Sequence, residues 1–271
     1  MTLKNKIYDC VTFFDENLIV NSRFEILKDV VDYFVVVESN YDHKGNKKRI
    51  NFKLQNKKFK DRVRHIVIEK NFPNLENVWD IESFQRERIY EGINDSSEND
   101  YIMYSDSDEI PNPKIIRNLN LNKKYGIFLQ SFFVYKINIF NEHETPWEGT
   151  RICKKKNLKS IDWMRSKVLS KNLKYGFWRI DKEKNIELIN EGGWHFNYLL
   201  KPNEISKKFK SLAETSWDKE EYFNEENIIK KIDLKKDLFN RGHTFDVVKI
   251  NDSYPEYIKG NKDKYQDWII K

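Results

Sequence analysis

The sequence predicts an α/β fold in which a Rossmann-like mixed sheet is flanked by helices. Three observations carry this prediction. Over the first 110 residues, strand-like and helix-like patterns alternate along the chain. The segment YFVVVES, Tyr33 to Ser39, is a nearly continuous β-branched and aromatic run, which is typical of a buried parallel strand. Finally, the apolar segment YIMY (101–104) runs directly into the acidic segment SDSDE (105–109).

The elements of the first half follow from apolar spacing. Ile7 to Phe14 is predicted to be a strand, and Asn21 or Ser22 is expected to cap a helix that extends to Val31. We expect further strands at 33–39, 65–69 and 101–104, and a second helix at 79–93. Pro111 and Pro113 are expected to prevent a helix directly after the acidic segment and to hold that loop open.

After residue 115 the pattern changes to longer, more widely spaced elements. Strands are predicted at 127–135 and 185–190, and helices at 203–214 and 225–234. No linker, repeat or change in composition marks a boundary. We therefore predict one domain over 1–271, with a nucleotide-binding half (1–113) and an acceptor-shaping half (114–271).

The composition favours a soluble enzyme-sized domain over a nucleic-acid or membrane-spanning protein. Hydrophobic residues make up 39% of the 271 residues, and the 34% of charged residues are mixed in sign. The net charge of +6 suits an anionic ligand such as a nucleotide phosphate without requiring nucleic acid. The densest lysine clusters, Lys154 to Lys156 and Lys207 to Lys210, are interpreted as solvated faces.

The cysteines and the N-terminus indicate the compartment. Cys10 and Cys153 form no CxxC pair, so the sequence predicts neither a zinc site nor a disulfide framework. The apolar run after the first lysines is interrupted by Asp15 and Glu16, too early for a signal peptide. No window approaches about 20 apolar residues, so no transmembrane segment is expected. We expect a soluble cytoplasmic protein, or one peripheral to a membrane surface.

The acidic segment after the strand at 101–104 is a candidate metal site. Ligands of open α/β sheets bind beyond the carboxyl ends of the strands, where Asp106 and Asp108 are expected. Carboxylates on such a loop can bind Mg²⁺ or Mn²⁺ and leave positions open for a diphosphate. The alternative is a solvated acidic turn in which one aspartate caps local backbone amides.

A second candidate lies in NEGGWHFNY, Asn190 to Tyr198. Gly192 and Gly193 permit positive backbone torsions or a close approach of another backbone. His195 could complete a metal shell through its neutral imidazole, or it could be a packed core histidine between aromatic residues. Spacing alone favours the core histidine.

Six blocks, taken in order, resemble glycosyltransferase family 17, the family of the enzyme that adds bisecting N-acetylglucosamine. Together they span nearly the whole chain. They are IYDCVTFFDE (7–16) with Arg23 in the following helix, VVDYFVVVES (30–39), FQRERI (84–89), SDSDEIPNP (105–113), GGWHFNY (192–198) and YPEYIKGNKDKY (254–265).

The resemblance implies a glycosyltransferase-A type fold, a divalent metal and a nucleotide-sugar donor, with UDP-N-acetylglucosamine as the expected donor. It implies inversion at the anomeric carbon if a β-linked product forms from an α-linked donor. The animal members are membrane-anchored, whereas this sequence shows no anchor. We therefore expect that the acceptor glycan need not be an N-glycan, and that a cell-envelope or phage-type glycan is an equal alternative.

These implications assign roles to particular residues. Asp106 and Asp108, with the metal, are expected to bind the leaving diphosphate, and His195 to be a further metal ligand. Arg86 or Arg88 is a candidate phosphate contact, although helical arginines usually face solvent.

The catalytic base and the acceptor contacts are assigned in the same way. Glu191 is the first candidate for the base, Glu148 the second and Glu109 the third. For acceptor contacts the candidates are Trp147, Trp194 and Tyr198, which could stack on sugar rings or pack in the core.

Two other classes of function stay open at this point. A metal-dependent nuclease or phosphodiesterase could use Asp106, Asp108 and Glu69 around two ions. A non-catalytic glycan-binding module could use the aromatic residues alone.

Overall fold

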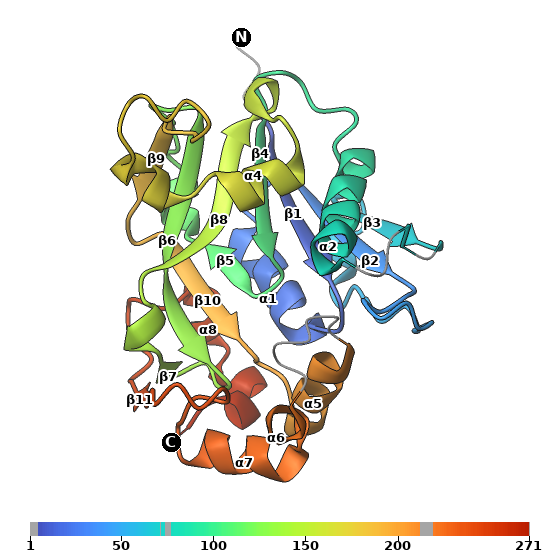
Figure 1. The fold of residues 1–271 in the computed structure, drawn as a ribbon, viewed down its shortest axis with the longest axis vertical. Helices are drawn as coiled ribbons and strands as arrows, with labels where there is room; N and C mark the ends of the chain where they lie inside the picture. The colour runs from blue at the N-terminus through green and yellow to red at the C-terminus, as the bar shows by residue number, and fades with distance from the viewer. Residues whose placement is uncertain (1–4, 71, 74–76, 212–218, 271) are drawn as a thin grey trace.

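A single mixed sheet forms the centre of the molecule (Figure 1). The computed structural model describes residues 5–70, 72–73, 77–211 and 219–270. Within them the main path of the sheet runs in the order β11-β7-β6-β8-β4-β1-β2-β3, and β5, β9 and β10 are attached beside it. The predicted α/β architecture, with a mixed sheet flanked by helices, is confirmed.

The first half of the chain supplies the parallel strands. They are β1 (Ile7–Phe13), β2 (Tyr33–Ser39), β3 (Val63–Ile68) and β4 (Tyr101–Asp106). Strand β1 pairs in parallel with both β2 and β4, and β3 continues the sheet beyond β2. The carboxyl ends of β1, β2 and β4 therefore lie at one edge, as the sequence predicts.

The second half closes the other side of the sheet with mixed pairing. Its strands are β5 (Glu109–Pro111), β6 (Tyr125–Val134), β7 (Ile139–Phe140), β8 (Trp147–Lys154), β9 (Ile186–Ile189), β10 (Gly193–Asn197) and β11 (Asp246–Val247). Strand β8 is antiparallel to both β4 and β6, whereas β9 and β10 are parallel to β6. Strand β10 is also antiparallel to β5, so it lies between β5 and β6.

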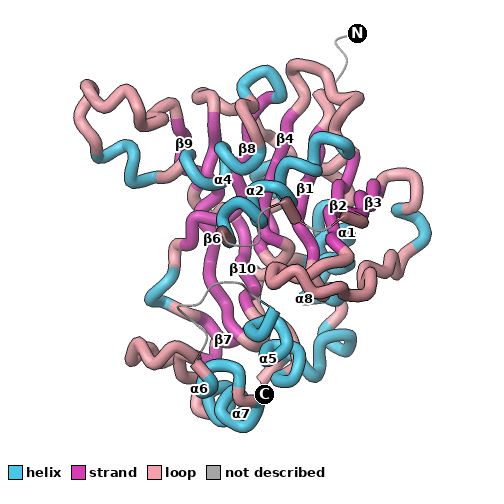
Figure 2. Tube along the Cα trace, turned by 45° about the vertical axis from the view of Figure 1, so that its right-hand side comes forward, coloured by secondary structure: helices cyan, strands magenta, loops and turns pink. Residues whose placement is uncertain are grey.

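Helices cover both faces of the sheet. The α-helices are α1 (Asn17–Leu27), α2 (Val78–Glu87), α3 (Pro113–Ile116), α4 (Ile161–Lys167), α5 (Pro202–Ser211), α6 (Glu220–Phe223), α7 (Glu225–Asp233) and α8 (Glu256–Gly260). Short 3₁₀ turns include η2 (Arg88–Gly92) and η5 (Ser170–Lys174). Helices α2 and α4 lie in front of the sheet in Figure 1 and α1 and α8 behind it, while α5, α6 and α7 gather below (Figures 1 and 2).

The strand alternation explains how two cores form. In β1, Val11 faces α1 and packs with Phe24, whereas its neighbour Cys10 faces the opposite layer and packs with Ile89 and Met164. All five side chains are buried. Cys10 is thus a small residue of the second core.

Several element boundaries differ from the sequence predictions. Helix α1 begins at Asn17, not at Asn21 or Ser22, and ends before Val31. Asn21 lies inside the helix because its amide donates to the carbonyl oxygens of Asn17 and Lys53, so its polar group is satisfied there. The predicted helix at 79–93 changes to the 3₁₀ turn η2 after Glu87.

One further prediction is wrong, and another falls partly outside the described residues. Pro113 does not prevent a helix: it is the first residue of α3, where its missing N–H costs nothing, and Asn112 caps that helix. The predicted helix at 203–214 corresponds to α5, and its last residues, 212–214, lie outside the described residues.

Candidate active site

A cavity opens beyond the carboxyl ends of β1, β2 and β4. Its volume is about 330 Å³. Thr12, Ser39 and Asp108 line it from the ends of the three strands, and Tyr198 and Lys208 reach it from the second half of the chain. The site predicted at the end of the strand 101–104 is therefore a cavity to which both halves contribute.

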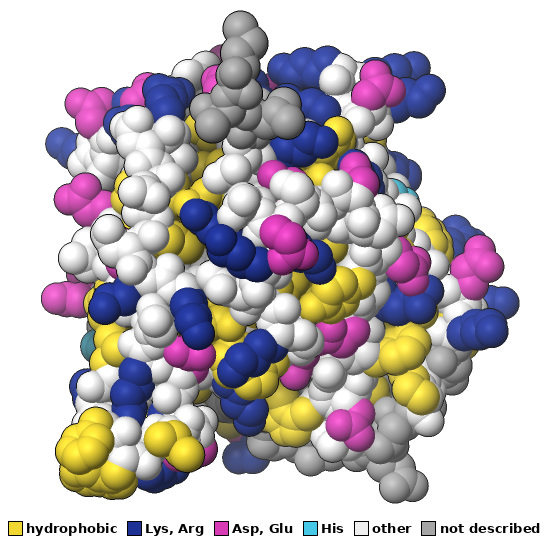
Figure 3. Space-filling view, turned by 90° about the horizontal axis from the view of Figure 1, so that it is seen from above, with side chains coloured by type: hydrophobic (Ala, Val, Ile, Leu, Met, Phe, Trp, Pro, Cys, Tyr) yellow, Lys and Arg dark blue, Asp and Glu magenta, His cyan; other side chains and the backbone are white. Residues whose placement is uncertain are grey.

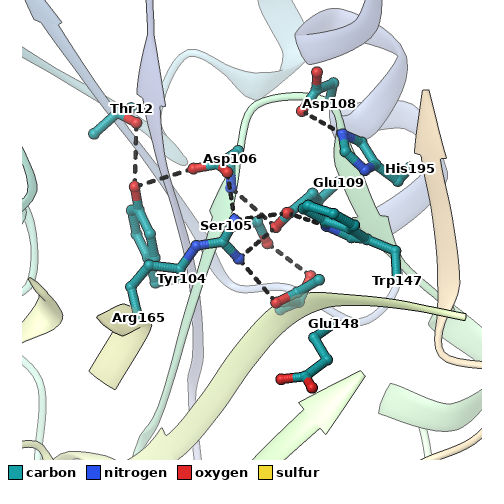
Figure 4. Close-up of polar contacts among 12 residues, drawn as sticks. Thr12, Tyr104, Ser105, Asp106, Asp108, Glu109, Trp147, Glu148, Arg165 and His195 are labelled. Atoms are coloured by element: carbon teal, nitrogen blue, oxygen red, sulfur yellow. Dashed lines mark hydrogen bonds and ion pairs between the residues drawn. The ribbon is translucent and has the colours of Figure 1, made fainter. Parts of the chain in front are cut away.

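Arg165, on α4, binds two of the three carboxylates of the acidic segment, as Figure 4 shows. One guanidinium nitrogen contacts both Asp106 and Glu109, and a second donates to Glu109 at 3.1 Å. Glu109 is fully buried and also accepts a hydrogen bond of 2.7 Å from the indole of Trp147. We call Asp106, Glu109 and Arg165 the Arg165 cluster.

The Arg165 cluster neutralises two of the three neighbouring carboxylates. Burial alone would raise the pKa of Asp106, but the positive charges of Arg165 and Arg86 outweigh this and lower it. Burial by itself would lower the pKa of Arg165, yet Asp106 and Glu109 raise it. Both partners are therefore held in their charged forms.

Asp108 faces the other way, toward His195. The Nε2 of His195 lies 3.4 Å from Oδ1 of Asp108, and both side chains are largely buried. The imidazole packs against the rings of Phe132 and Trp147, with ring centroids 4.4 Å and 5.0 Å away. Although burial alone would lower the pKa of His195, the carboxylates of Asp108, Glu109 and Asp106 raise it.

The two glycines before His195 explain how it reaches this position. A Cβ at Gly193, where φ is 127°, would lie 2.1 Å from the carbonyl oxygen of Ile110. A Cβ at Gly192 would lie 2.6 Å from the backbone nitrogen of Leu129. Glycine is needed at both positions because β10 lies so close to its two neighbours, and this places His195 opposite Glu109 in the ladder.

A buried ion pair between Arg23 and Asp9 holds the backbone of the acidic segment 105–109 in place. Arg23, on α1, binds both carboxylate oxygens of Asp9 at 2.6 Å and the hydroxyl of Ser105 at 2.9 Å. It also donates to the backbone carbonyl of Glu109. Arg23 thus connects α1, β1, β4 and β5, which fixes the backbone on either side of Asp106 and Asp108.

A second cation borders the cavity on the side of Asp108. Lys208, on α5, forms a 2.7 Å ion pair with Glu16, which directly precedes α1. Burial alone would raise the pKa of Glu16, but Lys208 and the backbone amides of Asp15 and Phe14 lower it to about 2. This pair links the two halves of the chain beside the cavity.

The donor set at Asp108 and His195 fits a divalent cation. Two ligands about 2.1 Å from one ion and at right angles to each other are about 3 Å apart, close to the observed 3.4 Å. Over the described ranges no three His, Cys, Asp or Glu side chains converge into a complete ligand set. Such an ion would take its remaining ligands from phosphate and water.

Comparison with known protein families assigns the chain to one of them. Residues 1–249 match glycosyltransferase family 17. The chain belongs to this family. It is therefore a sugar-transferring enzyme, as the resemblance implies, which removes the nuclease and the non-catalytic glycan-binding module as alternatives. Glu69, the third carboxylate of the nuclease hypothesis, is exposed after β3 and does not line the cavity.

Solved structures of glucosyl-3-phosphoglycerate synthase from Mycobacterium tuberculosis are also similar to this family 17 chain. The complex with Mn²⁺, UDP and phosphoglyceric acid is 11% identical, with a TM-score of 0.38 over 69% of this chain and 68% of that chain. A second structure of the synthase is 12% identical, with a TM-score of 0.39 over 70% and 72%. No curated protein matches the sequence.

The structure does not bring Glu191 or Trp194 to the cavity of this transferase. Both line a separate cavity of about 790 Å³, together with Ser253 and Tyr254. Adjacent residues of a strand point to opposite faces, so Trp194 points away from the face of His195, and its indole binds the carbonyl oxygen of Ser253. Glycines 192 and 193 do not leave room for a sugar, because backbone occupies that space.

Three other predicted residues do not line the cavity of about 330 Å³, and each of them is bound by neighbouring residues instead. Glu148 accepts hydrogen bonds from the backbone and hydroxyl of Ser170. The guanidinium of Arg86 binds Glu82, Asp162 and the hydroxyl of Tyr104. Arg88 pairs with Glu91 on the surface of η2.

Two of the predicted acceptor contacts do line the cavity. Trp147 lies between His195 and Glu109, and Tyr198 stacks against Phe209 of α5. Burial raises the pKa of Tyr198 to about 12, so its hydroxyl is protonated at neutral pH.

Sequence reasoning missed Arg165, Glu16 and Lys208. Arg165 lies 56 residues from Glu109, in a helix that no pattern marked, and no local spacing links the two. The crowding of three carboxylates was the available signal, since it required a cation that the segment itself does not contain. Lys208 was visible only as one member of a lysine cluster.

Proposed function

We propose that this glycosyltransferase is metal-dependent and inverting, and that it transfers N-acetylglucosamine from UDP-N-acetylglucosamine to a hydroxyl of a glycan. The observation that carries the metal dependence is the 3.4 Å approach of Asp108 and His195 at the carboxyl ends of parallel strands. The identity of the sugar rests on the resemblance to the family alone.

Asp108 and His195 would hold the cation, and Asp106 would contribute through its position in the same cavity. When bound, the cation would offset the charge that develops on the departing diphosphate. The Arg165 cluster leaves Asp106 half-buried and already paired, so we assign Asp106 a role in positioning the donor rather than in direct coordination.

The rest of the cavity suits a uridine diphosphate. Thr12, Ser39 and Gln85 offer hydroxyl and amide groups near the ends of β1 and β2. Lys48 and Lys208 supply positive charge near the position of a diphosphate. In this proposal the first half of the chain provides most of the donor contacts, and its nucleotide-binding role stays a prediction.

The acceptor is proposed to enter from a neighbouring cavity of about 520 Å³. Trp147 lines both cavities, and Glu148, Arg165 and Lys171 line the second one. An aromatic ring between the two cavities is a suitable surface for a sugar ring. Of the three bases proposed from sequence, Glu148 is the best placed, because Glu191 lies in the cavity on the other side of β10 and both oxygens of Glu109 are occupied by Trp147 and Arg165.

Calorimetry with UDP tests the proposal directly. We expect UDP to bind in the presence of Mn²⁺ and to bind at least about tenfold more weakly after chelation or in Asp108→Asn, because loss of a metal ligand removes the link to the diphosphate. Asp246→Asn, an exposed aspartate on β11, is the matched control and should bind as the native chain does. Metal-independent UDP binding would refute the proposal.

A donor-hydrolysis screen tests the choice of sugar. UDP-, GDP- and CMP-sugars are incubated with the protein and Mn²⁺, and release of free sugar is measured without any acceptor. We expect UDP-N-acetylglucosamine to be hydrolysed fastest. Faster hydrolysis of another UDP-sugar would show that this other sugar is the donor, and it would leave the proposal for the metal site unchanged.

A further inference from the structure

The loop between η5 and β9 exposes a group of large apolar side chains. Phe177, Trp178 and Ile180 are 87%, 70% and 94% exposed, and Phe177 and Trp178 contact each other with ring centroids 5.4 Å apart. Leu173 and Tyr175 beside them are also exposed. Single exposed apolar residues are ordinary, but a contiguous group marks an interaction surface.

The loop holds this group through its own hydrogen bonds. The backbone nitrogen of Arg179 donates to the carbonyl oxygen of Gly176 at 3.1 Å, and that of Ile180 donates to Trp178 at 2.9 Å. The ammonium of Lys184 binds the carbonyl oxygens of Gly176 and Arg179 at 2.6 Å and 3.1 Å. The apolar side chains are thus presented outward by a turn whose polar groups are satisfied within it.

This loop lies at the end of the sheet opposite the active site. The backbone nitrogen of Lys124, just before β6, donates to the side chain of Asn185, just before β9, at 2.8 Å. Strands β6 and β9 are parallel and begin side by side at Tyr125 and Ile186. In Figure 1 the loop projects at the upper left, whereas the carboxyl ends of β1 and β4 point downward. Binding at this end would leave the active site open.

Positive charge surrounds the apolar group. Residues 170–185 contain five basic and two acidic side chains, which gives a net charge of +3. Lys123 and Lys124 precede β6, and Lys154 ends β8 at the same end of the sheet, opposite Tyr101 in the ladder. Figure 3, a view from above, shows apolar side chains at one corner, and both blue and magenta side chains across the face. The cluster Lys154 to Lys156 therefore belongs to this surface.

We propose that this end of the molecule docks on a lipid bilayer that contains anionic headgroups. Phe177, Trp178 and Ile180 enter the interfacial region, and the surrounding lysines face the headgroups. Aromatic residues with flanking lysines are characteristic of the membrane interface. The proposal is independent of the donor and metal assigned above.

The size of the apolar group favours a bilayer over a protein partner. The two aromatic rings bury roughly 300–500 Å² together, at about 150–250 Å² each, whereas a stable protein interface takes about 800 Å² from each partner. A bilayer needs only the insertion of a few side chains plus electrostatic attraction. No helix in the described part of the chain is long and apolar enough to cross a membrane.

Vesicle co-sedimentation of the full chain tests the proposal. Vesicles of phosphatidylcholine alone are compared with vesicles that also contain phosphatidylglycerol. We expect binding to the anionic vesicles only, weakened at least about tenfold in Trp178→Ser, since burial of a large apolar side chain contributes that much or more. Trp79→Ser, which removes a 69% exposed tryptophan on α2, is the matched control and should bind normally.

Two further measurements test whether the variant is folded and whether the lysines contribute to vesicle binding. UDP-sugar hydrolysis by Trp178→Ser should equal that of the native chain, which shows that the variant is folded. Lys123→Glu with Lys174→Glu, two exposed lysines at this end of the sheet, should weaken vesicle binding further and reduce its dependence on salt. The proposal is overturned if the native chain ignores anionic vesicles, if Trp178→Ser binds them normally, or if size exclusion instead shows a dimer that Trp178→Ser dissociates.

Discussion

The two sides of the acidic segment differ in what neutralises them. On one side, Asp106 and Glu109 are paired with Arg165, and Glu109 has every oxygen occupied by protein donors. On the other, Asp108 faces the imidazole of His195 at 3.4 Å, within the cavity that Lys208 also lines. Of the three carboxylates, two are thus paired with Arg165, and Asp108 is the one that we expect to be available to a metal ion.

This difference shows why the motif alone was ambiguous. The solvated-turn interpretation and the metal interpretation both treat the carboxylates as equivalent. The structure makes them unequal by placing a cation from α4 on one side and a histidine from β10 on the other. Substitutions on the two sides should therefore have different consequences, the first for stability and the second for binding.

The largest effect is expected from Arg165→Met. This change leaves Glu109 buried and Asp106 without its ion pair, and removal of one partner from a buried pair typically costs about 3–5 kcal/mol. Urea unfolding measures it. Arg88→Met, which removes an exposed pair with Glu91, is the control and should cost less than about 1 kcal/mol. Equal losses in the two variants would contradict the structural role of the Arg165 cluster.

Glu16→Gln should change the acid stability of the protein. The pKa of Glu16 falls from an ordinary 4.5 to about 2, so its contribution is fully present above pH 4.5 and is lost as the pH falls toward 2. That shift corresponds to about 3 kcal/mol at neutral pH. The native chain should therefore be more stable than the variant at pH 7, and the difference should shrink between pH 4.5 and pH 2.

Unfolding free energies at several pH values in this range check the expectation. A difference between the two proteins that stays constant with pH would show that Glu16 acts through packing and not through its charge. Glu256→Gln, at an exposed pair with Lys259, is the control and should show little change at any pH.

The two base candidates should separate in a transfer assay. Glu148→Gln is expected to slow transfer by about 10²-fold, the lower end of the range for general-base loss, with UDP affinity unchanged. Glu191→Gln should transfer normally, because Glu191 lines the cavity on the far side of β10. The reverse result would restore Glu191 as the base and require a different path for the acceptor.

The parallel half of the sheet was predictable because its signals are local. The strand at 33–39 and the position of Asp106 and Asp108 at a strand end follow from continuous apolar runs. The double glycine before His195 was also informative, since one of its two expected meanings, the close approach of another backbone, is what β10 requires.

The partners that decide the site could not be predicted, because they come from distant parts of the chain. Arg165 and Lys208 meet Glu109 and Glu16 across 56 and 192 residues. The start of α1 at Asn17 was missed because Asn21, which looks like a cap, is satisfied inside the helix by a carbonyl from residue 53. Glu191 lies only four residues before His195 in the sequence, yet it lines the cavity on the other side of β10.

The central claim is that Asp108 and His195, and not the Arg165 cluster, hold the metal. Anomalous diffraction from a crystal of the protein with Mn²⁺ and UDP tests this most directly. The account predicts one manganese peak within about 2.3 Å of both a carboxylate oxygen of Asp108 and a ring nitrogen of His195, with diphosphate oxygens completing the shell. A peak bound to Asp106 or Glu109 with Arg165 displaced, or no peak near Asp108, would contradict it.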